Sequence, residues 1–347
     1  MYTSTPSVLW RFLDSFSVIF ESLFFFLRVV QLFLFTLSWD SLLFSLFTVL
    51  FFKMSSTGEE ASAHTSERRG GKWLPLEANP MVFAQYVNEI GGSVSFGVEQ
   101  GDEVERKHEG RNEAVLSFED ILSFEDWALE MLRHPTVAVL LLYPITKETE
   151  EIRKKQAQEE DKDKQTEDGD GKKSSLWYTK QTVGNACGTI ALLHCLANLP
   201  RDRFPLQPGG FLEKFLEETA NLTPEERAKK LETDNALASA HKSYETKGQS
   251  SVPTPERSDV DTHFVAFVYD EKTGCLYELD GRKNRPINHG PVLSGTEERG
   301  AQKKQLEDVQ GLPLLRKAMD VIKKEFVEKS PPGELRFQLI AVESARS

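Results

Sequence analysis

The sequence predicts a mixed α/β (α+β) fold, because helical and strand-like patterns alternate along most of its 347 residues. Residues 137–143 are a continuous apolar, β-branched run, which is typical of a fully buried strand. Residues 263–269 and 275–279 are β-rich and flank an Asp-Glu-Lys-Thr-Gly turn, which predicts a β-hairpin. Intermixed helices and strands indicate the fold class, but they leave the order of strands in the sheet open.

The first 53 residues differ in kind from the rest of the chain. They hold 12 of the 23 phenylalanines, and residues 29–52 form an apolar run that only Asp40 interrupts. This run is long enough to cross a bilayer, although an ionised group near its middle costs roughly 2.5–3.5 kcal/mol. Met54 is followed by a polar stretch typical of an amino terminus, so residues 1–53 could equally be a leader that the mature protein lacks. A cleaved signal peptide fits less well.

Residues 54–72 are expected to be a disordered linker, and residues 73–347 a globular domain. Asn79 and Pro80 are a helix-start signal, helical spacing of apolar residues follows, and Gly91-Gly92 ends the helix. The sequence Leu-Ser-Phe-Glu-Asp occurs twice, at 116–120 and 122–126. We expect both copies to belong to one amphipathic helix that runs to His134.

A charged insertion occupies residues 147–173. Of its 27 residues 18 are charged, with mixed sign and no aromatic residue. Such a segment buries too little apolar surface to hold a fixed conformation, so we expect it to be disordered. The remaining expected elements are helices at 211–218, from Thr223 onward and at 312–328, a long loop at 242–260, and a strand at 335–342.

Composition excludes several classes of protein. The net charge of −12 argues against nucleic-acid binding. Three cysteines, at 187, 195 and 275, argue against a disulfide scaffold and for a reducing compartment, which favours the cytoplasm. Neither a CxxC nor an HExxH pattern occurs, so no metal site is expected.

Residues 180–194 carry the most informative pattern. Gly184 and Asn185 interrupt the chain, and Cys187 then opens an apolar helix. A thiol at a helix amino terminus meets the positive end of the helix dipole, which lowers the pKa of the thiol. Backbone amides there can donate to a developing oxyanion, and the Gln181 side-chain amide is a reasonable second donor. The alternative interpretation is a buried cysteine without chemistry.

A thiol nucleophile needs an imidazole base and a group that orients it. His194 is nearest, but seven positions along a helix correspond to roughly 10 Å, so we interpret it as a packing residue. His263 is different, because it begins the predicted hairpin whose other strand ends at Asp280. The five other histidines lie in settings that favour structural roles or surface loops: His64, His108, His134, His241 and His289.

The predicted hairpin could bring His263 and Asp280 together. If its turn is centred between Glu271 and Lys272, the two residues are directly opposite, with Cβ atoms about 4.5–5.5 Å apart. A one-residue bulge at Gly274 would instead place them on opposite faces. A plain turn is the alternative interpretation of Asp280 and its following glycine.

Four segments resemble the ubiquitin C-terminal hydrolase family, in order and at compatible spacing. They are WLPLEANP at 73–80, QTVGNACGT at 181–189, HF at 263–264 and LYELDGRKNRPINHG at 276–290. The likeness is greatest to the short members, which lack a carboxyl-terminal extension, and it spans most of residues 73–345. Departures from the family are the apolar leader, residues 97–113, the charged insertion and residues 294–310.

The resemblance implies a papain-like αβα sandwich, with a central, mainly antiparallel sheet flanked by helices and a knotted backbone. It implies Cys187 as nucleophile, His263 as base, Asp280 as orienting acid and Gln181 as oxyanion donor, with a crossover loop around residues 242–260. Three segments are implied to contact ubiquitin. They are Pro75, Leu76, Glu77, Ala78, Asn79 and Pro80; Thr246, Lys247, Gly248, Gln249, Ser250, Ser251, Val252 and Pro253; and Glu334, Leu335, Arg336, Phe337, Gln338 and Leu339.

The implied function is that of a deubiquitinating cysteine hydrolase that releases small adducts or short peptides from the terminal glycine of ubiquitin through a thioester. No metal or organic cofactor is implied, and we expect a cytoplasmic monomer, with membrane attachment through residues 29–52 only if the leader is retained. Two alternatives stay open: action on another ubiquitin-like modifier as well, and a non-catalytic ubiquitin-binding module.

Overall fold

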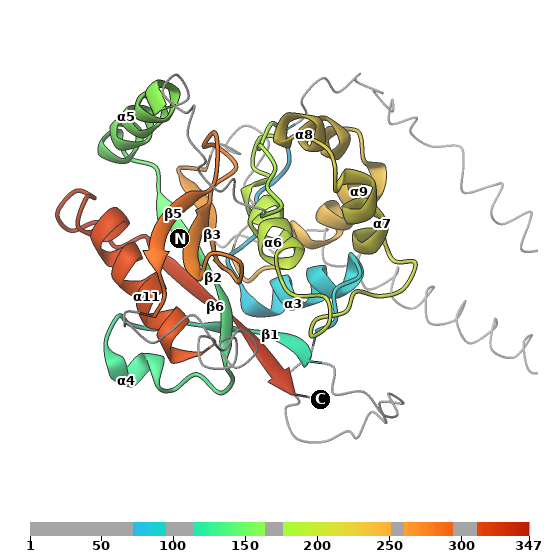
Figure 1. Ribbon diagram of the computed structural model, residues 1–347, viewed down its shortest axis with the longest axis horizontal. Helices are drawn as coiled ribbons and strands as arrows, with labels where there is room; N and C mark the ends of the chain where they lie inside the picture. Colours follow the sequence, from blue (N-terminus) through green and yellow to red (C-terminus); the bar gives the residue numbers. More distant parts are fainter. Residues whose placement is uncertain (1–71, 95–113, 164–175, 251–259, 294–310, 347) are drawn as a thin grey trace, which may run out of the picture. The chain divides into compact units, whose positions relative to one another are not determined.

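The described residues form a six-stranded sheet in the order β1-β6-β2-β3-β4-β5 (Figure 1). All neighbouring strands are antiparallel. The strands are β1 (Ala114–Asp120), β2 (Thr136–Pro144), β3 (Thr262–Asp270), β4 (Cys275–Leu279), β5 (Ile287–Pro291) and β6 (Gln338–Arg346). The computed structural model describes residues 72–94, 114–163, 176–250, 260–293 and 311–346, which belong to one unit spanning residues 68–347.

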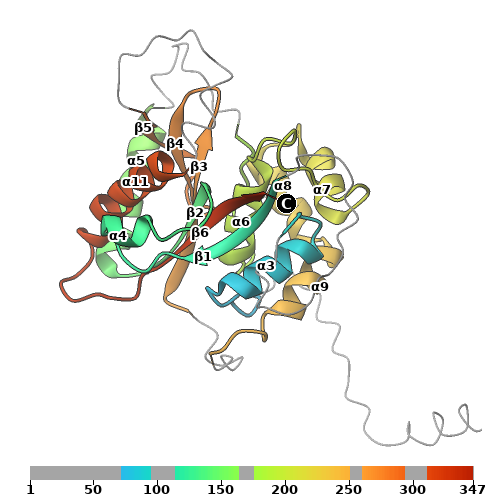
Figure 2. The same cartoon turned by 90° about the horizontal axis from the view of Figure 1, so that it is seen from below.

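Helices cover both faces of the sheet, which confirms the predicted mixed fold (Figure 2). On one side lie α3 (Pro80–Glu89) and α6 (Cys187–Ala197), with α7 (Phe211–Thr219), α8 (Pro224–Glu232) and α9 (Asn235–Tyr244) beyond them. The other side holds α4 (Asp126–Leu129), α5 (Lys147–Asp163), α11 (Leu312–Ile322) and the π-helical turn η2 (Lys323–Val327). Each face has its own cluster of buried apolar side chains, because successive residues of a strand point to opposite faces.

The start of α3 confirms the predicted cap. The Asn79 side chain accepts hydrogen bonds from the amides of Met81 and Val82, and Pro80 occupies the first helical turn. Gly91, at φ 102°, then turns the chain after the helix. Leu76 and Ala78, which lead into α3, are buried in the same cluster as α6, so the cap fixes a segment that packs beside Cys187.

The predicted helix over the repeated Leu-Ser-Phe-Glu-Asp sequence is wrong. Its first copy is strand β1, in which Leu116 and Phe118 are buried and alternate with more exposed residues. Only the short helix α4 follows. The reason is non-local, since β1 pairs along its whole length with β6, more than 200 residues later.

Disorder across the charged insertion is also contradicted, because residues 147–163 form α5. Thr146 and Thr149 cap its start reciprocally: the Thr149 amide donates to Thr146 Oγ1 at 3.2 Å and the Thr146 amide to Thr149 Oγ1 at 2.8 Å. Acidic residues occupy the first turn, and Glu150 pairs with Arg153 three positions on. Residues 164–173 lie outside the described residues.

The remaining predicted helices and the last strand are confirmed with small changes of boundary. Helix α8 begins with a capping box between Thr223 and Glu226, and the predicted helix at 312–328 is α11 continued by η2. Strand β6 begins at Gln338 rather than at 335. The predicted loop at 242–260 starts later, because α9 extends to Tyr244.

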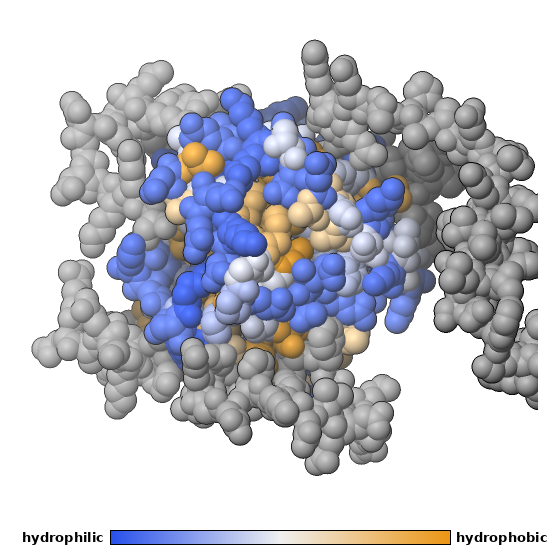
Figure 3. Space-filling view, turned by 90° about the vertical axis from the view of Figure 1, so that its right-hand side faces the viewer, coloured by the Kyte–Doolittle hydropathy of each residue, from blue (hydrophilic) through white to orange (hydrophobic). Residues whose placement is uncertain are grey.

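Seen from the side of α7, α8 and α9, the surface is mostly hydrophilic around an apolar area (Figure 3).

The apolar leader (1–53) and nearly all of the expected linker (54–72) lie outside the described residues. Within the described part of the chain, no helix has both the length and the apolarity needed to cross a bilayer.

Candidate active site

Cys187 is the first residue of α6, and it is buried. The turn before it requires an unusual backbone, because Asn185 has φ 60°. Asparagine is among the few residues that adopt this left-handed conformation readily. Its side-chain amide also donates to the Trp73 carbonyl at 2.8 Å. The Gly-Asn break therefore starts the helix at the thiol and ties this start to the segment that leads into α3.

His263 and Asp280 meet through the hairpin of β3 and β4. The observed register pairs Ala266 with Leu279, so Asp280 lies diagonally across from His263 on the same face rather than directly opposite. The pairing runs without a bulge from Asp270 to Ala266. His263 Nε2 and Asp280 Oδ1 are 2.6 Å apart, and both side chains are almost fully buried.

The electrostatics of Cys187, His263 and Asp280 favour a thiolate beside an imidazolium. Burial alone would lower the pKa of His263, but the Asp280 carboxylate and the contact with Cys187 raise it to about 9. Burial alone would raise the pKa of the Cys187 thiol. Interactions with His263 and with the amides of Phe264 and Gly188 outweigh burial, so the pKa of Cys187 is lowered. Since Nε2 of His263 is held by Asp280, Nδ1 is the ring nitrogen left to face the sulfur.

The turn that carries Asp280 is held from several directions. Asp280 Oδ1 also accepts from the Arg282 amide at 2.8 Å. The Tyr178 hydroxyl lies 2.7 Å from the Asp280 carbonyl and 2.6 Å from the Lys283 carbonyl. Burial works against ionisation of Asp280, but His263 and Lys283 hold the pKa of its carboxyl well below the usual range. Sequence reasoning missed Tyr178, because its role depends on backbone carbonyls about 100 residues away.

Gln181 lies against this turn. Its backbone amide donates to the Gly281 carbonyl at 2.8 Å, and its side-chain amide donates to the Val183 carbonyl at 3.2 Å. A primary amide has two N–H bonds, so a second one is available to an oxyanion. A Cβ on Gly281 would come within 2.9 Å of Gln181 Cβ. Glycine is thus required where the candidate acid and the candidate oxyanion donor approach each other.

Two of the other histidines are structural. His194 is fully buried, with Nε2 3.1 Å from the Thr179 amide, which agrees with its predicted packing role. His241 Nε2 lies 2.7 Å from the Leu74 carbonyl and its Nδ1 2.8 Å from Thr189 Oγ1. Burial lowers the pKa of each imidazole to about 4, so both are neutral at pH 7. His289 lies in β5, and its Nε2 is 2.9 Å from Glu278 Oε2.

The structure brings the three expected substrate-binding segments together. The Glu77 carboxylate accepts from the amides of Gln249 at 2.9 Å and Ser250 at 2.7 Å. Gln338 Nε2 donates to the Ala78 carbonyl at 2.5 Å, which joins the third segment to the first. Of the expected substrate contacts, Ser251, Val252 and Pro253 lie outside the described residues. The other side chains of these segments include the exposed Leu335.

Comparisons with known proteins show which family the chain belongs to. The family model described as "Ubiquitin carboxyl-terminal hydrolase, family 1" matches residues 108–311. Ubiquitin carboxyl-terminal hydrolase 3 of Arabidopsis thaliana is 40% identical over 282 residues, which cover 81% of this chain and 97% of that protein. The chain belongs to family 1 of the ubiquitin carboxyl-terminal hydrolases.

Further relatives agree with this family assignment. A Drosophila melanogaster ubiquitin carboxyl-terminal hydrolase is 34% identical over 277 residues, covering 79% of this chain and 98% of that protein. The crystal structure of the Trichinella spiralis UCH37 catalytic domain bound to ubiquitin vinyl methyl ester has a TM-score of 0.53 at 22% identity, covering 79% of this chain and 96% of that one. Like the rest of its family, this ubiquitin carboxyl-terminal hydrolase is a deubiquitinating cysteine hydrolase with a papain-like fold.

Proposed function

We propose that Cys187 is the nucleophile of this hydrolase, His263 its general base and acid, and Asp280 the group that orients His263. The observation that supports these roles best is the 2.6 Å contact between His263 and Asp280, placed against a thiol at the start of α6. The lowered pKa of Cys187 and the raised pKa of His263 agree with it, because an attacking thiol must be ionised while the leaving group needs a proton.

In the first half of the proposed reaction, the Cys187 thiolate attacks the carbonyl carbon of the terminal glycine of ubiquitin. The electron pair of the carbonyl moves to its oxygen, which the Cys187 amide and the Gln181 side-chain amide stabilise. The tetrahedral intermediate then collapses to a thioester. His263 gives its proton to the leaving amine or alcohol as the carbon–leaving-group bond breaks.

In the second half, water attacks the thioester carbon. Neutral His263 takes one proton of this water, and the same two donors stabilise the oxyanion. The carbon–sulfur bond then breaks to release the terminal carboxylic acid of ubiquitin, which loses its remaining proton to solvent. The thiolate and the imidazolium are thereby restored. His263 gives the proton to the leaving group in the first half and takes one from the attacking water in the second, which is why its orientation by Asp280 matters in both halves.

We propose ubiquitin as the partner and small adducts or short peptides as leaving groups. The three segments expected to contact ubiquitin are joined to one another through Glu77 and Gln338. The chain between Ser250 and Val260 starts beside Glu77 and ends three residues before His263. A connection between these two points would restrict the size of the leaving group that reaches Cys187 if it passes over the site.

We propose a cytoplasmic monomer. Cys187, Cys195 and Cys275 are unpaired thiols, which is the state of cysteines in a reducing compartment. All four proposed catalytic residues come from one chain, so the site does not need a second copy to be complete.

The experiment that tests this function is hydrolysis of ubiquitin carrying a fluorogenic amide at its carboxyl terminus, with the full chain and the C187A variant. We expect turnover by the parent and none by the variant, with both proteins still binding ubiquitin. Activity that survives in C187A would remove Cys187 as the nucleophile. Binding without turnover in the parent would favour a ubiquitin-binding module.

A further inference from the structure

The charged helix α5 contacts the turn that carries Asp280. Glu150, in its first turn, pairs with Arg282 at 2.6 Å between Oε1 and Nη2. The same carboxylate accepts a hydrogen bond from Arg153 at 3.0 Å. Both Glu150 and Arg282 are about three-quarters buried, with 24% of each side chain exposed. Because burial reduces solvent screening, the Coulomb attraction within this pair is less screened than in an exposed surface ion pair, although burial also disfavours the charged form of Glu150.

An unbroken series of contacts leads from Glu150 to the nucleophile. The Arg282 side chain pairs with Glu150, while the Arg282 amide donates to Asp280 Oδ1 at 2.8 Å. The same oxygen lies 2.6 Å from His263 Nε2, and the interaction between His263 and Cys187 lowers the pKa of the thiol and raises that of the imidazole. The side chain of Arg282 is therefore held by α5, while its backbone amide holds Asp280, the proposed orienting acid.

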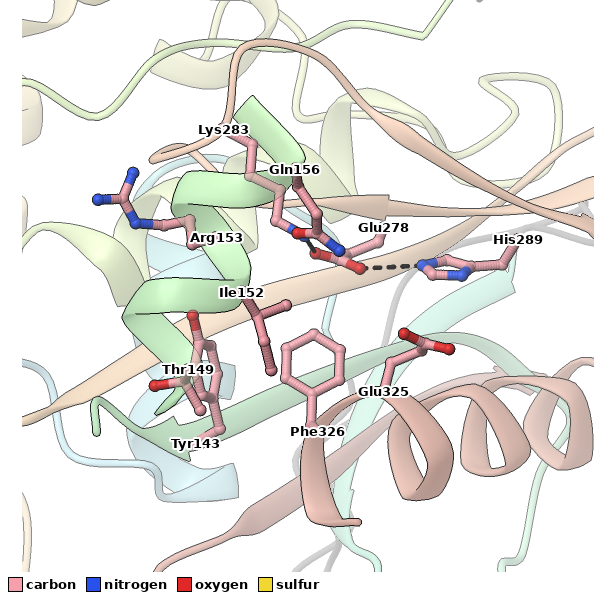
Figure 4. A pocket seen from close by; sticks show the side chains of 10 residues that line it. All are labelled: Tyr143, Thr149, Ile152, Arg153, Gln156, Glu278, Lys283, His289, Glu325 and Phe326. Atoms are coloured by element: carbon pink, nitrogen blue, oxygen red, sulfur yellow. Dashed lines mark hydrogen bonds and ion pairs between the residues drawn. The ribbon is translucent and has the colours of Figure 1, made fainter. Parts of the chain in front are cut away.

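The described side chains of α5, at residues 147–156, offer few other attachments that could locate the helix. Its sequence, KETEEIRKKQAQEEDKD, contains one large apolar residue, Ile152. Ile152 lines a pocket of about 30 Å³ between α5, the β4–β5 region and η2, together with Tyr143 and Phe326 (Figure 4). Glu278, on the far side of this pocket, is paired with Lys283 and His289. One apolar side chain positions a helix poorly, so the Glu150–Arg282 pair is the specific link between α5 and the Asp280 turn.

We propose that Glu150 is a positioning residue for hydrolysis: by holding Arg282 it keeps Asp280 against His263. This role rests on the proposed function, because it makes a residue of the charged insertion support the proposed catalytic residues Cys187, His263 and Asp280. Neither the family resemblance nor the composition of the insertion predicts it. The residue acts through Arg282 and Asp280 and has no contact with the reacting atoms.

The consequence for His263 has a definite direction. When Glu150 loses its charge, Arg282 is released, the hydrogen bond to Asp280 Oδ1 loosens, and the carboxylate supports the imidazolium less well. The pKa of His263 then falls. Among the described residues, the charged or titratable groups around His263 and Asp280 are Cys187 and His194 on α6, Tyr143 on β2, Lys283 and Arg282 after β4, Glu278 on β4, and Glu150 and Arg153 on α5.

The test is the E150Q variant of the full chain, with E151Q as its matched control. Glu151 lies on the same helix, is exposed and carries the same charge. We expect E150Q to lower kcat/KM at least threefold at pH 8 and to move the alkaline limb of the kcat/KM profile to lower pH. We expect E151Q to stay within about 1.5-fold of the parent with an unmoved limb. Circular dichroism and thermal unfolding check that both variants are folded.

A double-mutant cycle with R282Q completes the test. If Glu150 acts through Arg282, E150Q/R282Q is no worse than R282Q alone. The proposal would be overturned if E150Q and E151Q lowered kcat/KM equally. It would also be overturned if the effects of E150Q and R282Q on kcat/KM were independent. The pKa of His263, measured by NMR on histidine-labelled protein, gives a readout without turnover. A lower value in E150Q but not in E151Q supports positioning even if the parent does not hydrolyse ubiquitin, and equal values reject it.

Discussion

Asp280 shares one carboxylate oxygen between two donors, the His263 ring and the Arg282 amide. That sharing fixes the direction of the carboxylate, and it fixes the ring nitrogen that faces Cys187. The sequence was enough to predict Cys187, His263 and Asp280 as the candidate residues, because a helix start and a hairpin are local patterns. The support by Tyr178 could not, since its hydroxyl reaches a carbonyl 102 positions away along the chain.

The first prediction concerns Asp280→Asn. An amide removes the negative charge that raises the pKa of His263 and can donate to the ring where the carboxylate only accepts. We expect kcat/KM to fall by about 100-fold or more. The pKa of His263, about 9, predicts an alkaline limb of the parent's kcat/KM profile near that pH, and in the variant this limb should move to lower pH. Steady-state kinetics between pH 5 and 10 would show this, and an unmoved limb would contradict the role given to Asp280.

A second prediction at this scale is that Gly281→Ala damages the site by crowding. The new methyl group would meet Gln181 Cβ at 2.9 Å and Ile190 Cγ2 at 3.0 Å. We expect a loss of about 1–3 kcal/mol in the free energy of unfolding, as for other overpacked sites, together with a lower kcat. Urea unfolding and kinetics on one preparation measure both.

Gly290→Ala is the matched control for this crowding. Gly290 has φ +82°, but a Cβ there meets nothing within 4 Å. Its substitution should therefore cost stability through backbone strain while leaving kcat close to that of the parent. Equal losses of kcat in the two variants would show that crowding against Gln181 is not the cause.

At the scale of elements, two segments show why sequence patterns fail. The strand β1 contains a motif that also fits a helix, and only its pairing with β6 decides between the two. Helix α5 has the composition of a disordered segment, but reciprocal caps, an i,i+3 pair and the link to Arg282 stabilise it locally. For β1 the deciding contact lies more than 200 residues away, whereas for α5 the caps and the i,i+3 pair are local but composition does not register them, and only the link to Arg282 is distant.

Strand β6 carries a third prediction, at Glu343. This side chain is fully buried, and burial raises the pKa of its carboxyl to about 7. The unfolded chain releases this proton near pH 4.5, so the ionised group reduces stability progressively as the pH rises from 4.5 towards 7. Glu343→Gln should therefore raise the free energy of unfolding at pH 8 by about 1–2 kcal/mol.

The gain from Glu343→Gln should vanish at pH 4.5, where the native carboxyl is already protonated. Urea unfolding of both proteins at the two pH values measures the difference. The Glu343 carboxylate accepts from the His134 amide at 3.3 Å, and the Gln carbonyl can replace it there. A variant that is equally or less stable than the parent at pH 8 would show that Glu343 is ionised without cost.

At the scale of the whole molecule, the site lies where the two apolar clusters meet the same hairpin. Cys187 and Phe264 belong to the cluster on the α6 face. The Tyr143 ring, from the cluster on the α11 face, packs edge-on against His263 at 5.8 Å between ring centroids. The mixed fold was predictable from alternating patterns, but this convergence of two faces on one residue depends on sheet order and register, which the sequence leaves open.

The fourth prediction is a limit on the size of the leaving group. If the connection between Ser250 and Val260 restricts access to Cys187, a fluorogenic amide or a short peptide should leave ubiquitin far more readily than a second folded ubiquitin. We expect kcat/KM for di-ubiquitin joined by an isopeptide bond to be at least 100-fold below that for the fluorogenic substrate. Comparable rates on the two substrates would show that the connection does not act as a filter.

The position of β6 bears on how this enzyme is made. Although it is the last of the described strands, β6 lies between β1 and β2. On the ribosome, β1 and β2 therefore emerge with an edge each that has no partner until the final strand has left the exit tunnel. Unpaired edges attract other chains, so the nascent polypeptide needs protection throughout this interval. A message cut short before β6 would encode no smaller hydrolase, because the missing piece belongs to the middle of the sheet.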